Sequence, residues 1–84
     1  MADIMSGSVV VSKAGRDKGR FFLVVSVEND FALIADGDLR KLENPKRKKL
    51  KHLGATNVML EIGEPKCDKA LYNAIKERFY SQSR

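Results

Sequence analysis

The sequence predicts a mainly β protein: a small barrel of about five strands followed by one C-terminal α-helix. Two observations predict it. Short apolar runs rich in branched and aromatic residues are separated by tight-turn sequences as far as residue 62, and apolar residues then recur every four positions. A chain of 84 residues forms one domain that buries roughly 60 to 65% of its unfolded surface, so its core must be simple.

The first three strands follow one another closely. Residues 1–7 are small and polar enough to be a loose arm, and the run 9–11 then begins the β pattern. Residues 21–27 form a longer run whose alternate apolar positions, starting at Phe21, we expect to face the core. After a polar break suited to a hairpin, residues 31–35 resume the apolar pattern. Three such strands in sequence form a meander.

The second half of the barrel contains the basic stretch. Asp36 and Asp38 flank a turn glycine, so we interpret them as turn residues and not as a general acid and base. Residues 46–49 are wholly cationic, but leucines before and after them would anchor this stretch as an ordered edge. Residues 56–62 alternate apolar and polar side chains, which predicts a last strand that closes the sheet.

A helix is predicted after the break at 63–65. Cys67, Leu71, Ile75 and Phe79 recur every four residues, which places them on one helical face with Cys67 as a small core residue. The helix would begin with Pro65 in its first turn or with Asp68 as its N-cap. Because so short a helix is marginal alone in water, its apolar stripe must pack on the barrel or on another molecule.

Short strands with tight turns followed by one helix are typical of a small SH3-like barrel. The predicted organisation is a flexible N-terminal arm at 1–7, the barrel at 8–62, and a hinge with the C-terminal helix at 63–84.

Positive charge is concentrated in two stretches. Residues 40–52 hold seven Lys or Arg and one Glu, a net charge of +6, and residues 13–20 hold four and one Asp, a net charge of +3. The rest of the chain carries −4. A basic footprint on an otherwise acidic body is expected of a protein that binds nucleic acid or an anionic membrane. The membrane alternative is weak, because no basic amphipathic helix accompanies the charges.

The loop between the first two strands is built for contact with phosphate. Gly15 and Gly19 allow positive φ and a close approach of the backbone, and Arg16, Lys18 and Arg20 crowd the same turn. Like charges repel there unless a polyanion neutralises them. The loop is not a nucleotide-binding P-loop, because the Gly-Lys-Ser/Thr ending and a following helix are both missing. An ordinary soluble hairpin is the alternative.

Residues 9–25, with Ser12-Lys13-Ala14-Gly15-Arg16-Asp17-Lys18-Gly19-Arg20 at their centre, resemble the KOW motif of ribosomal proteins and NusG-type transcription factors. In that motif a glycine equivalent to Gly19 sits in the loop between the first two strands. The likeness continues through residues 33–37, 44–45 and 51–53. Over these residues the chain is similar to a group of KOW-containing large-subunit ribosomal proteins of archaea and eukaryotes.

The resemblance implies an SH3-like barrel that contacts structured RNA, above all ribosomal RNA, as a ribosomal protein or a ribosome-associated translation factor. Its first loop and the adjoining basic surface would make the contacts. The candidate RNA-binding residues are Lys13, Gly15, Arg16, Lys18, Gly19, Arg20, Arg40, Lys41, Lys46, Arg47, Lys48, Lys49, Lys51 and His52. Phe22 is interpreted as a core residue, with stacking on an unpaired base as the alternative.

No residues form a catalytic constellation, and Cys67 with His52 is not a ligand set for zinc. We therefore expect a cytoplasmic, monomeric, non-enzymatic protein with no cofactor, metal, membrane or small-molecule partner, and with ribosomal proteins as further possible contacts. The alternative from another class is a protein-interaction adaptor that docks on the ribosome or RNA polymerase through the barrel or the helix. The fold class does not decide between the two.

Overall fold

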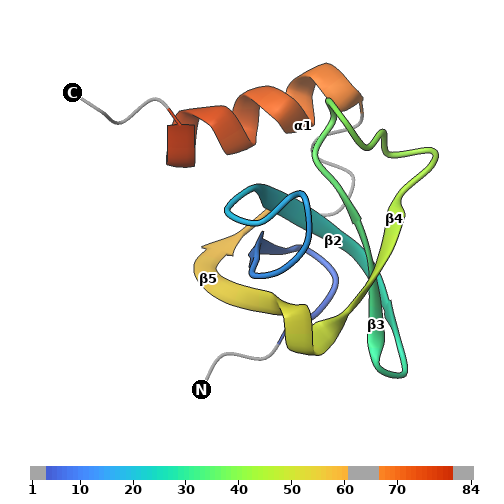
Figure 1. Cartoon of the computed structure of the whole chain (residues 1–84). Coiled ribbons are helices and arrows are strands. Elements are labelled where there is room, and N and C mark those ends of the chain that lie inside the picture. Colours follow the sequence, from blue (N-terminus) through green and yellow to red (C-terminus); the bar gives the residue numbers. More distant parts are fainter. Residues whose placement is uncertain (1–3, 61–66, 81–84) are drawn as a thin grey trace.

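The computed structural model describes residues 4–60 and 67–80. Five strands form one antiparallel sheet in the order β4-β3-β2-β1-β5. They are β1 (Ser8–Ser12), β2 (Phe21–Glu28), β3 (Phe31–Ala35), β4 (Lys46–Lys49) and β5 (Leu53–Met59). The sheet curls around an interior, and a C-terminal helix lies outside it (Figure 1). The mainly β class with a barrel-like sheet and one helix is confirmed.

The last strand completes the sheet at its edge. β5 pairs with β1, and β4 pairs with β3, so the described sheet is open between β4 and β5. A turn of 3-10 helix, η1 (Leu50–His52), connects these two edge strands. β5 begins three residues before the predicted strand, because Leu53 is already buried in the interior. Residues 61 and 62 of that prediction lie outside the described residues.

Both faces of β2 are buried, each in a different core. Phe22 and Val24 point into the barrel, where they pack with Val10, Ile34 and other buried residues. Leu23 points the other way, towards the helix. The face that starts at Phe21 was expected to face the core, and it does so in the second core against the helix, whereas the neighbouring face fills the barrel interior. The interpretation of Phe22 as a core residue is confirmed, since it is 1% exposed.

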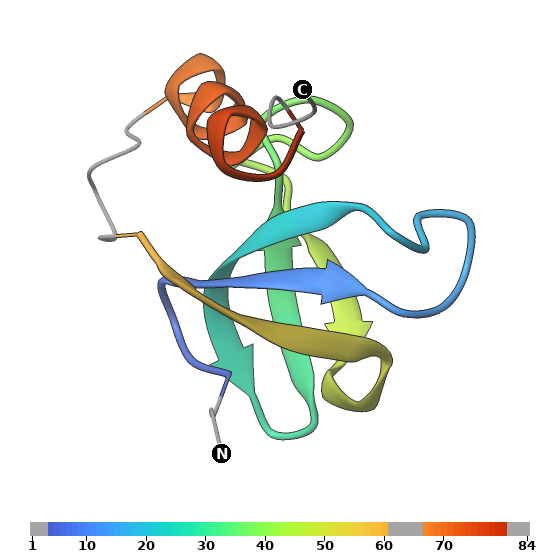
Figure 2. The ribbon, with the colours of Figure 1, turned by 90° about the vertical axis from the view of Figure 1, so that its left-hand side faces the viewer.

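The helix covers one side of the sheet. It consists of α1 (Asp68–Ile75) and a π-helical extension, η2 (Lys76–Tyr80). Leu71 and Ile75 are buried against the sheet, and the Phe79 ring stacks on Phe21 with centroids 4.0 Å apart. Figure 2 shows the helix lying beside β2, outside the sheet. In the part of the chain that the structure describes, no helix combines the length and hydrophobicity needed to cross a membrane.

The start of the helix differs from the prediction. Cys67 is exposed at the N-cap position and is not a core residue. Asp68 is the first helical residue, and its carboxylate accepts a hydrogen bond from the backbone N–H of Leu42 at 2.6 Å. This contact uses the carboxylate to hold the loop after β3, so it is not an N-cap. The hinge at 63–65, including Pro65, lies outside the described residues.

Residues 4–7 are part of the packed domain and not a loose arm. Ile4 packs against the barrel core, and the Gly7 N–H donates to the Val24 carbonyl at 2.9 Å. The Gly7 carbonyl in turn accepts from the Leu60 N–H at 2.8 Å. This turn links the middle of β2 to the residue that follows β5, so the described part of the predicted arm, residues 4–7, is packed against the sheet.

Candidate nucleic-acid interface

The loop between β1 and β2 is a defined turn. Gly15 and Gly19 have φ values of +87° and +89°, in the left-handed region that favours glycine. The Gly19 N–H donates to the Ser12 carbonyl at 2.8 Å, and the Arg20 N–H donates to the Asp17 carbonyl at 2.9 Å. These bonds turn the Asp17 side chain inward, where it accepts a hydrogen bond from the Ser12 hydroxyl at 2.7 Å. The cationic loop is therefore organised around its one carboxylate.

Asp17 ties this loop to the basic strand. The Lys48 ammonium lies 2.7 Å from one of its carboxylate oxygens, and the Lys46 ammonium lies 2.9 Å from the other. The two basic stretches of the sequence therefore meet on one side of the barrel. The carboxylate that joins them neutralises part of their charge.

Lys48 is structural. Lys48 is only 8% exposed, and its ammonium donates a second hydrogen bond, to the Ala14 carbonyl at 2.8 Å. A phosphate outside the protein does not have access to a buried ammonium that is already paired. The prediction that Lys48 contacts RNA is corrected for this reason.

The ion pairs also set the protonation of Asp17. Burial alone would raise its pKa, but hydrogen bonds from Lys48, Lys46 and Ser12 outweigh burial, and the pKa falls well below its usual value. Asp17 is therefore a carboxylate throughout the physiological range. It holds Lys46 in place at the edge of the site.

A second set of ion pairs places the loop that follows β3. The Arg20 guanidinium lies 3.4 Å from Asp36 and 3.8 Å from Asp38. Asp36 also accepts hydrogen bonds from the backbone N–H groups of Asp38 and Arg40, both at 2.9 Å, which fits its predicted role as a turn residue. The Arg20 Nε is buried and has no acceptor among the described residues, so its guanidinium is only partly satisfied.

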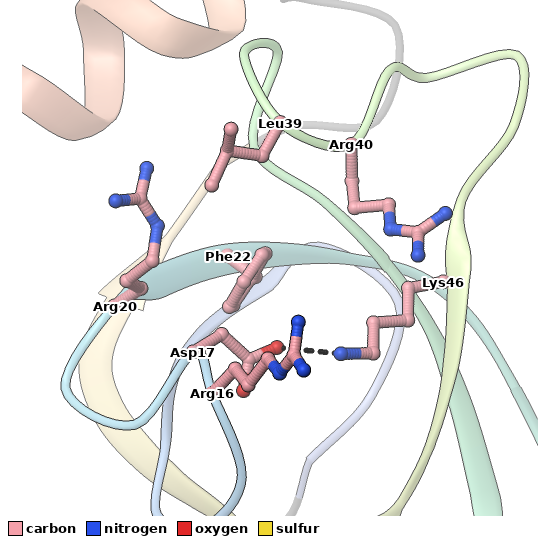
Figure 3. Close-up of a pocket in the computed structure, with 7 residues that line it drawn as sticks. All are labelled: Arg16, Asp17, Arg20, Phe22, Leu39, Arg40 and Lys46. Carbon is pink, nitrogen blue, oxygen red and sulfur yellow. Dashed lines mark hydrogen bonds and ion pairs between the residues drawn. The ribbon is translucent and has the colours of Figure 1, made fainter.

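A hollow of about 370 Å³ opens where these segments meet. Arg40 and Lys46 reach into it from the β4 side and Arg16 from the first loop, with the Phe22 ring behind them (Figure 3). Four cations and one carboxylate surround the hollow, which we call the basic hollow. Its lining residues are Arg16, Asp17, Arg20, Phe22, Leu39, Arg40 and Lys46.

The exposed cations of the basic hollow are chemically suited to an anion. Within residues 4–60 and 67–80, no ion pair involves Arg16 or Arg40. Guanidinium groups form strong, often bidentate, hydrogen bonds with phosphate oxygens. The hollow can therefore receive a phosphate group, and it contains no nucleophile with an adjacent base.

The remaining predicted residues lie on other parts of the surface. Side chains alternate along β4, so Lys46 and Lys48 face the first loop whereas Arg47 and Lys49 face the other side. Lys13, Lys18, Lys41 and Lys51 are exposed, and His52 is half-buried. The Lys13 N–H donates to the His52 carbonyl at 2.8 Å, which joins the first loop to η1.

Sequence reasoning missed two contributors to the basic hollow and one contact on the other side of β4. Leu39 lines the basic hollow at 64% exposure, and Asp17 orders its cations. The signal for Asp17 was present, since a single acid among crowded cations is the natural partner for them. Phe31, which was taken only as a strand residue, lies under the Arg47 guanidinium at 3.9 Å. Nothing in the local sequence marks that contact, because it depends on the register between β3 and β4.

The chain matches no model of a known protein family, and the search of curated proteins finds no significant match. The geometry of the basic hollow and the sequence pattern are therefore the grounds for a functional assignment.

Proposed function

We propose that this protein is a non-enzymatic RNA-binding module that acts on the ribosome and holds folded RNA through phosphate contacts at the basic hollow. The resemblance of residues 9–25 to a KOW motif supports the choice of ribosomal RNA. The concentration of positive charge in two stretches supports a polyanionic partner.

One observation carries the proposal. Two segments that are distant in sequence, the first loop with Arg16 and the stretch after β3 with Arg40 and Lys46, meet around a single hollow. A basic stretch that served only solubility would not need to converge with another one. Lysines on an edge strand also discourage pairing with a second sheet, but that role requires no hollow and no contribution from the first loop.

The mechanism is electrostatic positioning. Asp17 fixes the Lys46 ammonium at the rim, and the glycines of the first loop let the RNA backbone approach closely. Phosphate contacts set the position of the RNA but carry no sequence information, so the shape of the folded RNA supplies selectivity. If the hollow neutralises about four phosphates, the slope of log affinity against log salt is about −3 to −4.

The test is the double variant Arg16→Gln/Arg40→Gln. We expect it to bind ribosomal RNA about tenfold more weakly at low salt and to reduce the salt slope by about two. Fluorescence anisotropy across a salt series measures both quantities. The matched control is Lys69→Gln/Lys76→Gln, which removes the same charge from the exposed side of the helix and leaves the slope nearly unchanged.

If Arg16→Gln/Arg40→Gln and Lys69→Gln/Lys76→Gln lose the same affinity for ribosomal RNA, the net charge of the protein, and not the basic hollow, is responsible for binding. Crosslinking in cell extract followed by sequencing of the attached nucleotides then identifies the RNA. Recovery of no RNA would end the proposal.

A protein-interaction adaptor that docks through the helix stripe is not favoured. Leu71 and Ile75, which would form the docking face, are buried against the sheet, and Phe79 is stacked on Phe21. RNase treatment of the extract separates the two functions, because association with ribosomes through RNA is lost and association through protein survives.

A further inference from the structure

A second hollow, of about 480 Å³, lies at the other end of β4. It is formed by the turn between β2 and β3 together with η1, and the Leu50 N–H joins the two by donating to the Asp30 carbonyl at 2.8 Å. Its lining residues are Asp30, Phe31, Lys49, Leu50 and Lys51. It combines an aromatic ring, an aliphatic side chain, a carboxylate and two ammonium groups.

The aromatic wall of this hollow is held in place. The β3–β4 register pairs Phe31 with Lys49 and Leu33 with Arg47, so Arg47 is the diagonal neighbour of Phe31 on the same face. The Arg47 guanidinium lies over one face of the ring, 3.9 Å from its centroid, so a ligand can meet only the other face or the edge of Phe31. Phe31 is half-buried, and with Leu50 it gives the hollow a fixed apolar wall.

The polar groups of the hollow select a ligand that is both a hydrogen-bond donor and an anion. Asp30 takes part in no ion pair among the described residues, and an ionised carboxylate only accepts hydrogen bonds. Lys49 and Lys51 are exposed and only donate. An unpaired nucleotide supplies both groups, and its flat base fits an aromatic wall.

The carboxylate favours one base. Guanine presents two adjacent donors on its Watson–Crick edge, N1–H and the 2-amino group, which match the two oxygens of a carboxylate. Adenine, cytosine and uracil each place an acceptor next to their donor, so they pair with a carboxylate through one hydrogen bond at most. Guanine is therefore the base that the hollow accommodates best.

We propose that this second hollow binds one unpaired guanine of the RNA, with the base against Phe31 and Leu50, its Watson–Crick edge on Asp30 and its flanking phosphates on Lys49 and Lys51. The assignment rests on the proposed RNA-binding function and adds base selectivity to it. Lys46 at the basic hollow and Lys49 at this one are three residues apart on one strand, a span of about 10 Å. Their side chains lie on opposite faces of β4, which is an edge strand, so an RNA segment that contacts both hollows passes around this edge.

The experiment compares two heptauridine RNAs whose central base is replaced by guanine or by adenine. We expect the guanine oligonucleotide to bind the full chain about tenfold more tightly, since a bidentate contact discriminates by that order. In Asp30→Asn the preference falls to near unity while the affinity for the adenine oligonucleotide is kept. In Phe31→Leu the affinity for both oligonucleotides falls several-fold, and a thermal melt confirms that this variant is folded.

Failure of this inference is distinguishable from failure of the proposed function. Equal binding of the two oligonucleotides, or a preference that survives Asp30→Asn, overturns the guanine site. If Arg16→Gln/Arg40→Gln still weakens binding of ribosomal RNA in that case, the proposed function stands without it. Absence of binding to either oligonucleotide also overturns the site, and absence of binding to ribosomal RNA overturns both.

Discussion

Asp17 determines how the cations around the basic hollow are arranged. Its two oxygens receive the ammonium groups of Lys46 and Lys48 from β4 and the hydroxyl of Ser12 from β1. Without it, the first loop and β4, which both carry mostly positive charge, would repel each other. The same carboxylate therefore stabilises the fold and positions a cation for an external anion.

Replacing Asp17 tests this role directly. Asp17→Asn leaves Lys48 buried without a counter-charge, so we expect the free energy of unfolding to fall by about 3 kcal/mol. Urea denaturation measures the loss. The matched control is Asp38→Asn, because Asp38 is 52% exposed and lies 3.8 Å from Arg20. That exposed pair is worth less than about 1 kcal/mol, and equal losses in the two variants would contradict the central role of Asp17.

The depressed pKa of Asp17 predicts how the stability of the fold decreases at acid pH. A carboxylate with a lowered folded-state pKa contributes stability that is complete above its usual pKa of 3.8 and is lost as the pH falls towards the folded-state value. We therefore expect the wild-type melting temperature to fall steeply below about pH 4. In Asp17→Asn this part of the decline is absent, which thermal melts between pH 2 and pH 6 will show. Parallel curves for the two proteins would contradict the assignment.

At the scale of elements, the strands were more predictable than their faces. β2 and β3 were expected at nearly the observed residues, because branched and aromatic runs between polar turns indicate strands from local sequence alone. Core residues were expected on both faces of β2, at Phe21 and at Phe22, but which of the two faces fills the barrel was not predicted. It depends on the helix, whose Leu71 and Ile75 cover Leu23, and alternation within one strand does not report what lies above it.

Gly37 fixes the contact between the helix and the loop after β3. Its φ is +82°, and a Cβ at this position would collide with the Asp68 carbonyl and lie 2.9 Å from the Tyr72 nitrogen. Gly37→Ala must therefore both strain the backbone and displace α1. We expect the free energy of unfolding to fall by about 3 kcal/mol, more than the 1 to 2 kcal/mol that positive φ alone costs an alanine.

Gly19→Ala is the control for that substitution. Gly19 has a φ of +89°, but nothing lies within 4 Å of the position of its Cβ. The decrease in the free energy of unfolding of Gly19→Ala therefore measures backbone strain alone. We expect about 1 to 2 kcal/mol by chemical denaturation. If Gly37→Ala is no worse than Gly19→Ala, the helix does not depend on close contact at Gly37.

At the scale of the whole molecule, the helix and the candidate sites divide the sheet between them. The helix lies outside the sheet (Figure 1), where it covers Leu23 and Ala35. The basic hollow (Figure 3) and the second hollow flank β4. The charge pattern predicted which stretches would carry the cations. It could not predict that Lys48 is buried or that Arg47 faces away from Lys46, because both follow from strand register.

The two cores share β2 and β3, so we expect the barrel and the helix to unfold as one cooperative unit. Leu71→Ala removes a fully buried side chain between them and should lower the free energy of unfolding by about 2 to 5 kcal/mol. Far-ultraviolet circular dichroism follows the whole backbone, and tyrosine fluorescence follows the helix, because both tyrosines of the chain, Tyr72 and Tyr80, belong to it. Coincident transitions by the two probes are the expected result, in the wild type and in the variant.

The control for the core substitution is Lys69→Ala on the exposed face of α1, which should change stability by less than about 0.5 kcal/mol. A tyrosine transition that precedes the loss of β structure would show that the helix detaches from a barrel that is stable alone. In that event Leu71→Ala would shift only the earlier transition, and the basic hollow would keep its RNA affinity with the helix released. Cooperative unfolding instead predicts that Leu71→Ala lowers the stability of the RNA-binding surface along with that of the helix, because β2 and β3 belong to both cores.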